Sequence, residues 1–151
     1  MANEAYRAVF LRVHPTGKMV LSLTTEADGR ESEYQQLTAD QLGVPPLDVK
    51  VVPADTDRFG NGHGFNTAPS PGVPAAITSA TDKILDKARL LAGAALGASP
   101  ETLQWRDGEF VTSGEPPQAA TIADVAMYSL GSGKLPPGVE GGLDAQTVYR
   151  H

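Results

Sequence analysis

Residues 75–97 carry the strongest helical pattern in the chain, and this pattern constrains what the rest of the sequence can form. Apolar residues recur there every three or four positions: Ile77, Ala80, Ile84, Ala88, Leu91 and Ala95. The charged residues of the same stretch fall mostly on the opposite side. A helix with one apolar stripe has to bury that stripe against another layer of structure. The remaining sequence must therefore supply a sheet or further helices that cover it.

Short runs rich in apolar and β-branched residues can form that layer. Residues 8–14 and 18–25 flank Pro15-Thr16-Gly17, which predicts a hairpin because proline presets φ and glycine tolerates positive φ. Strands are also predicted at three further places: residues 49–52, residues 102–112 with Asp107-Gly108 at a second hairpin turn, and residues 144–149.

Two more helices complete the pattern. Residues 32–43 have apolar side chains near one face, with Ser32 as the expected N-cap and Gly43 as the stop. Thr121 begins another helix, with an acidic residue three positions on, as in a capping box. Strands and helices mix without strict alternation. We therefore predict a single domain over residues 1–151 with an α+β fold, in which about three helices pack on one face of a small mixed sheet.

Charge and composition narrow the classes of partner. The chain has 12 Lys and Arg against 18 Asp and Glu, a net charge of −6, and no basic run. Nucleic acid and anionic membranes are therefore not expected as partners, because both bind clustered cations. The absence of cysteine excludes disulfides and thiolate ligands. No signal-peptide pattern and no membrane-length apolar run is present, so we predict a cytoplasmic protein.

The stretch "DTDRFGNGHGFNTAPSPG", residues 55–72, separates the third predicted strand from the longest helix. It contains four glycines and two prolines, and connections of this length are usually functional or disordered. Its glycines can make turns only, or they can let a ligand approach the backbone. Asp57 and His63 within it, together with Asp28 from an earlier loop, are candidate acids or bases. Capping of the loop by aspartate is the alternative role for Asp57. The three histidines are too scattered to predict a metal site.

Four stretches, taken in order, resemble one known family. They are "RVHPTGKMVLSL", "QLTADQLGVPPLDVKVVPADTDRFGNG", "LQWRDGEFVTSG" and "LPPGVEGGLDAQTVY". They resemble an interior, molybdopterin-binding segment of the large subunit of the molybdenum hydroxylases, which include xanthine dehydrogenase, aldehyde oxidase and carbon monoxide dehydrogenase. The likeness covers residues 8–149. It implies an oxidoreductase that hydroxylates with water-derived oxygen and passes electrons to partner iron–sulfur and flavin components.

The resemblance also implies two cofactor-facing loops. The family's Gly-Gln-Gly and His-Glu-Thr-like run corresponds to Ala27-Asp28-Gly29 and Arg30-Glu31-Ser32, so Gly29 and Glu31 match and Asp28 replaces the glutamine. The second loop corresponds to residues 60–68, where the Gly-x-Gly is kept and the following arginine is absent. The matching cofactor-binding residues are thus Gly29, Glu31, Gly60, Gly62 and Gly64. The glutamate that serves as the family's base lies beyond residue 151.

Three functions remain open at this point. In the first, the chain is a subunit or domain of a molybdenum hydroxylase-like enzyme that completes its site with other chains. In the second, it is a repurposed segment that acts on a small organic substrate as a cofactor-free isomerase, hydratase or lyase, with Asp28, Asp57 or His63 as acid or base. In the third, it is a non-catalytic assembly module. We expect the isolated chain to lack molybdenum, and the last strand to lie against another subunit or a second copy.

Overall fold

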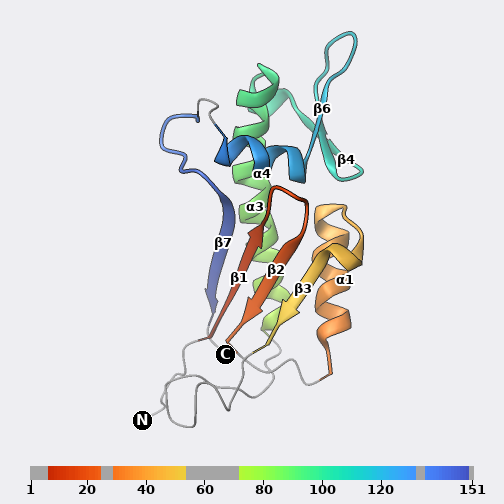
Figure 1. Cartoon of the computed structure of the whole chain (residues 1–151), viewed down its shortest axis with the longest axis vertical. Coiled ribbons are helices and arrows are strands. Elements are labelled where there is room, and N and C mark those ends of the chain that lie inside the picture. Colours follow the sequence, from red (N-terminus) through yellow and green to blue (C-terminus); the bar gives the residue numbers. More distant parts are fainter. Residues whose placement is uncertain (1–6, 25–28, 54–71, 132–134, 150–151) are drawn as a thin grey trace.

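The computed structural model describes residues 7–24, 29–53, 72–131 and 135–149. Its larger sheet has four strands in the order β3-β2-β1-β7 (Figure 1). These strands are β1 (Arg7–Val13), β2 (Met19–Leu23), β3 (Val49–Val52) and β7 (Leu143–Tyr149). β1 runs antiparallel to both β2 and β7, whereas β2 and β3 are parallel. The predicted small mixed sheet is therefore confirmed, and β7 forms one of its edges.

Three helices pack on one face of this sheet, as the sequence predicts: α1 (Glu31–Leu42), α3 (Val73–Leu96) and α4 (Ile122–Leu130). Alternate residues of the strands point toward them and are buried, among them Val9, Leu11, Met19, Leu21 and Leu143. The stripe of α3 is buried from Ile77 to Leu91. The α+β class is confirmed.

The last turn of α3 differs from its prediction. Ala95 is exposed, and Gly93 is buried instead. The short helix η2 (Pro100–Thr102) follows α3, and Pro100 packs so closely that a Cβ added to Gly93 would lie 3.0 Å from its Cγ. The buried face of the helix therefore turns toward η2 at this end, and Ala95 is left on the solvent side.

A second, three-stranded antiparallel sheet was not indicated by the sequence. It contains β4 (Gln104–Arg106), β5 (Glu109–Val111) and β6 (Ala119–Thr121) in that order. β4 and β5 form the predicted hairpin, and Asp107 and Gly108 at its turn have φ of 50° and 83°. Positive φ at both turn positions matches the right-handed twist of the flanking strands. β6 adds an unexpected third strand next to β5.

Two glycines hold this hairpin against the end of α1. Gly43 caps the helix with φ of 66°, as predicted, and Gly108 sits in the hairpin turn. A Cβ built on Gly43 would lie 2.4 Å from the Gly108 Cα, and one built on Gly108 would lie 2.3 Å from the Gly43 carbonyl oxygen. Only glycine fits such a contact between two backbones.

The beginnings of α1 and α4 are built differently. At α4, the Thr121 Oγ1 accepts from the Asp124 N–H at 3.1 Å, and the Asp124 Oδ2 accepts from the Thr121 N–H at 3.0 Å, which confirms the capping box. At α1, the prediction of Ser32 as N-cap is wrong. Ser32 lies inside the helix, Arg30 occupies the cap position, and its side chain makes no capping bond.

Replacing Thr121 with alanine is expected to lower the free energy of unfolding by about 1 kcal/mol, because the N–H of Asp124 loses its acceptor. Thr121→Ser keeps the hydroxyl and should stay within a few tenths of a kcal/mol of the unmodified chain. Urea unfolding of the two variants measures the difference. Equal midpoints for both would show that the capping box contributes nothing.

Candidate functional site

The candidate site lies at the edge of the larger sheet where β2 and β3 end. The two strands are parallel neighbours, with Ser22 beside Val52, and α1 forms the crossover between them. Their carboxyl ends and the start of α1 therefore meet at one edge, and Figure 1 shows that α3 also begins there. We call this region the strand-end edge. In sheets with parallel strands, ligands commonly bind outside the carboxyl ends of the strands, close to helix N-termini.

Gly29 and Glu31 are the predicted cofactor-binding residues that the structure describes, and both belong to the strand-end edge. Gly29 has φ of +79° and is exposed, and none of the atoms that the structure describes beyond its chain neighbours lies within 4 Å of the position that a Cβ would occupy. Among the described residues, nothing therefore covers its backbone directly before the first turn of α1. The first amides of that helix have no side-chain cap and carry partial positive charge.

The backbone at this edge suits the anionic phosphate of a molybdopterin, whereas the side-chain charges do not. An open glycine and uncapped helix amides suit the close approach of a phosphate oxygen. The side chains of Glu31 and Glu33 are exposed in the same turn and add negative charge, which opposes an anionic group. At α3, Pro74 in the first turn has no N–H to offer. The described residues therefore form a backbone cradle that fits the cofactor, with little cationic charge to hold it.

The other predicted site residues cannot be placed in this arrangement. Asp28, Asp57, His63, Gly60, Gly62 and Gly64 lie outside the described residues. The structure therefore tests neither their distances from Gly29 nor their proposed roles, and these remain predictions.

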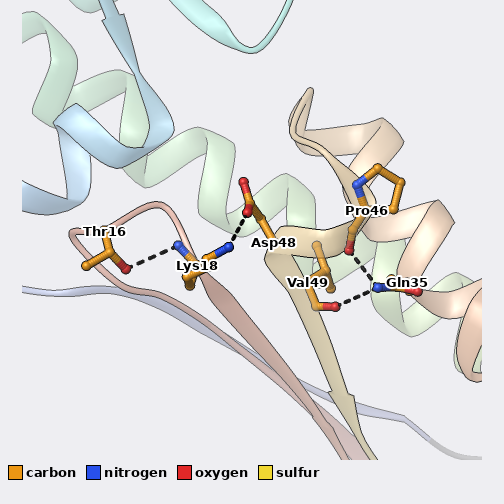
Figure 2. A network of polar contacts seen from close by, with 6 residues as sticks. All are labelled: Thr16, Lys18, Gln35, Pro46, Asp48 and Val49. Atoms are coloured by element: carbon orange, nitrogen blue, oxygen red, sulfur yellow. Dashed lines mark hydrogen bonds and ion pairs between the residues drawn. The ribbon is translucent and has the colours of Figure 1, made fainter.

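Polar contacts fasten the opposite end of the same β2-α1-β3 unit (Figure 2). The Lys18 Nζ, near the start of β2, lies 2.7 Å from the Asp48 Oδ1 in the short helix η1 (Pro46–Asp48). The Gln35 Nε2 of α1 donates to the carbonyl oxygens of Pro46 at 2.7 Å and Val49 at 3.0 Å. These bonds join the helix to the beginning of β3. The carboxyl end of the crossover is therefore tied to the beginning of β3 and of β2.

The sheet face away from the helices carries a shallow hollow that the sequence analysis did not single out. Its volume is about 630 Å³, and its lining includes Phe10, Arg12, His14, Val20 and Gln146. The alternation of polar and apolar residues in 8–14 was the available signal, since it places every second side chain on this face.

Among residues 7–24, 29–53, 72–131 and 135–149, no three His, Asp or Glu side chains gather as a metal site would require. Within the same ranges, no helix is long and apolar enough to cross a membrane.

Comparison with known proteins points to one family. The sequence model of the molybdopterin cofactor-binding domain family matches residues 1–151. The carbon monoxide dehydrogenase large chain of Afipia carboxidovorans is 32% identical over 142 residues, which is 92% of this chain and 17% of that protein. Subunit gamma of the 6-hydroxypseudooxynicotine dehydrogenase complex of Paenarthrobacter nicotinovorans is 28% identical over 127 residues, which is 80% of this chain and 15% of that protein.

A solved structure agrees with the sequence matches. The crystal structure of the Cu,Mo-CO dehydrogenase in its carbon monoxide reduced state superposes with a TM-score of 0.79 and 31% identity, covering 96% of this chain and 18% of that one. The chain thus spans less than a fifth of the relatives it matches, and the predicted resemblance to an interior segment is confirmed. The chain belongs to the molybdopterin cofactor-binding domain family, as a molybdopterin-binding segment of the molybdenum hydroxylases.

Proposed function

We propose that this chain is a subunit or domain of a molybdenum hydroxylase-like oxidoreductase, and that its strand-end edge supplies one wall of the molybdopterin site. The observation that carries this proposal is the open, left-handed Gly29 directly before an uncapped α1, at the carboxyl ends of two parallel strands. The family membership of the whole chain supports it. The relatives are a large chain and a complex subunit, which favours other protein subunits as partners.

Within this wall, we assign the backbone of Gly29 and the first amides of α1 to the anionic part of the cofactor. By resemblance, Gly60, Gly62 and Gly64 form a second stretch of backbone that the cofactor can approach closely. Glu31 lies at the rim of this wall. Molybdenum, when bound, supplies the redox chemistry, whereas this chain positions and encloses the group. Asp28 stands where the family has a glutamine, and an ionised carboxylate cannot donate the hydrogen bond that an amide gives.

We further propose that the site is incomplete without other chains. The exposed carboxylates of Glu31 and Glu33 repel an anionic cofactor, and the described part of the strand-end edge has Arg30 as its cation. Affinity must then come from groups that this chain does not supply. The single-domain organisation, the small organic substrate and the cytoplasmic location predicted from the sequence stay predictions, as do acid–base roles for Asp28, Asp57 and His63.

The isolated 151-residue chain is expected to contain far less than one molybdenum per molecule, whereas an assembly that includes the remaining large-subunit segments should contain about one. Elemental analysis of both purified samples measures this. Near-equimolar molybdenum in the isolated chain would refute the incomplete site. An assembly that holds this chain and no molybdenum would refute the proposed function itself, and turnover by that molybdenum-free assembly would favour the cofactor-free alternative.

A further inference from the structure

Two of the helices begin directly after the stretches that correspond to the family's cofactor-facing loops. Gly29 precedes α1, and Gly60, Gly62 and Gly64 come before α3 in the sequence. The two helices also pack against each other. The points at which the two loops join the fold are therefore set by the offset between α1 and α3, which is how far one helix is displaced along the other.

A glutamine bridges the two helices. Gln41, in the last turn of α1, has its amide between two threonines of α3. Its Nε2 donates to the Thr78 Oγ1 at 2.8 Å, and its Oε1 accepts from the Thr81 hydroxyl. The Thr81 Oγ1 also donates to the Thr78 carbonyl oxygen at 2.9 Å, and Thr81 is fully buried. Both ends of one amide are thus bonded to residues three positions apart in α3.

This bridge selects one offset where apolar packing is less exacting. Ala39, Leu42, Ile77 and Ala80 belong to the buried core around the two helices, and burial of apolar surface has no preferred direction. A hydrogen bond needs a donor and an acceptor within about 3.2 Å of each other. A displacement of half a helical turn, about 2.7 Å, would therefore break both bonds of the amide. Buried polar groups fix the register of helices in the same way in coiled coils.

The helices on either side of the bridge are fastened to opposite edges of the sheet. α3 is held to β7 by Lys83, whose Nζ donates to the Gln146 carbonyl oxygen at 2.7 Å. α1 is held to the beginning of β3 by the two bonds of Gln35. β3 and β7 are the edge strands of the sheet (Figure 1). Gln41 therefore joins two helices that are otherwise anchored on different sides of the fold.

We propose that Gln41, acting through Thr78 and Thr81, is a positioning residue of the molybdopterin site. The bridge holds the first turns of α1 and α3 at one offset, so that the backbone before each helix is presented to the same ligand. Gln41 lies about 15 Å along α1 from Glu31 and acts without touching that ligand. The inference rests on the proposed function, because the offset matters to a cofactor only if both loops face it.

The first test measures the offset in the full chain. Because the chain has no cysteine, Ser32→Cys and Ala75→Cys place two unique spin labels at exposed positions in the first turns of α1 and α3. Pulsed electron paramagnetic resonance then gives the distribution of distances between them. Gln41→Leu removes both bonds of the bridge but leaves the Thr81 hydroxyl bonded to the Thr78 carbonyl, so the variant should fold. Its distance distribution should be at least about twofold wider than that of the chain with Gln41.

Two further variants serve as controls. Gln41→Glu keeps the bridge, because its carboxylate accepts from the Thr81 hydroxyl and the Thr78 hydroxyl can turn to donate to it. Gln36→Leu makes the same substitution at an exposed position of α1, where the amide donates to the Asp40 Oδ1 at 2.7 Å. Both should keep the narrow distribution. The inference is wrong if Gln41→Leu, with its fold checked by circular dichroism, is as narrow as these controls.

The second test connects the offset to the cofactor, in assemblies that include the remaining large-subunit segments and carry no spin label. Gln41→Leu should contain at least about fivefold less molybdenum per chain than Gln36→Leu, and Gln41→Glu should restore most of it. Thr121→Ala, which loses stability at α4, should keep its molybdenum. Equal molybdenum in Gln41→Leu and Gln36→Leu, or an equal loss in Thr121→Ala, would overturn the positioning role and leave the proposed function standing. An unmodified assembly without molybdenum would overturn the proposed function, and this inference with it.

Discussion

Gly43→Ala and Gly108→Ala are each expected to lower the free energy of unfolding by about 3 kcal/mol or more. Both residues have positive φ, which costs other residues about 1–2 kcal/mol. Each added methyl group would also lie within 2.4 Å of the opposing backbone, and forced overpacking of this kind costs about 1–3 kcal/mol. The hairpin between β4 and β5 would have to move away from the end of α1. Urea unfolding measures the loss.

Gly97→Ala is the control for this effect. Gly97 caps α3 with φ of 67°, almost the same as Gly43, but no atom in the described part of the chain lies within 4 Å of an added Cβ. Its replacement should cost only the left-handed strain, about 1–2 kcal/mol. The difference between Gly43→Ala and Gly97→Ala is then the contribution of the contact between the two backbones. If the three variants lose the same stability, the close approach between α1 and the hairpin is not a constraint on the fold.

Gly29→Val is expected to reduce the molybdenum content of an assembly that contains this chain by about tenfold or more. A valine at φ of +79° would be strained, and its side chain would occupy the open space beside the first amides of α1. If a cofactor approaches the backbone there, it would be displaced. Metal analysis per assembled chain gives the result without any measurement of activity.

Gly97→Val again supplies the comparison. It introduces the same side chain at a left-handed glycine that also faces open space, but at the far end of α3. Both valine variants should therefore lose about 1–3 kcal/mol of stability, while only Gly29→Val loses molybdenum. Equal metal content in the two assemblies would remove Gly29 from the proposed wall. An equal loss in both would show that strain, and not position, causes it.

The elements with strong local signals were predicted well. The stripe of α3, the Asp107-Gly108 turn, the Gly43 stop and the capping box at Thr121 each depend on residues close together in the sequence. The order of these elements was enough for the α+β class, because each apolar face needs a covering layer. The family, too, was recognisable from four stretches in order, and this recognition needed no coordinates.

Other features had no local signal. β6 is three residues long, Ala119–Thr121, and becomes a strand because β5 offers it a partner. Ser32 is a favourable N-cap by type, yet Arg30 occupies the cap position two residues earlier and Ser32 lies inside the helix. The exposure of Ala95 follows from the packing of η2. For β6 and Ala95, packing against a neighbouring element overrides the local preference.

The candidate site likewise has some features that the sequence predicted and others that only the tertiary structure showed. The sequence by itself determined which residues could face a cofactor, since Gly29, Glu31 and the glycines of residues 60–64 were identified by their positions in a family pattern. Only the tertiary structure decided that the ends of β2 and β3 and the starts of α1 and α3 share one edge, that Gly29 lies open there, and that Lys83 reaches the Gln146 carbonyl. A sequence records residue types and spacing. Contacts between residues more than 60 positions apart exist only once burial of the α3 stripe has brought the strands and helices together.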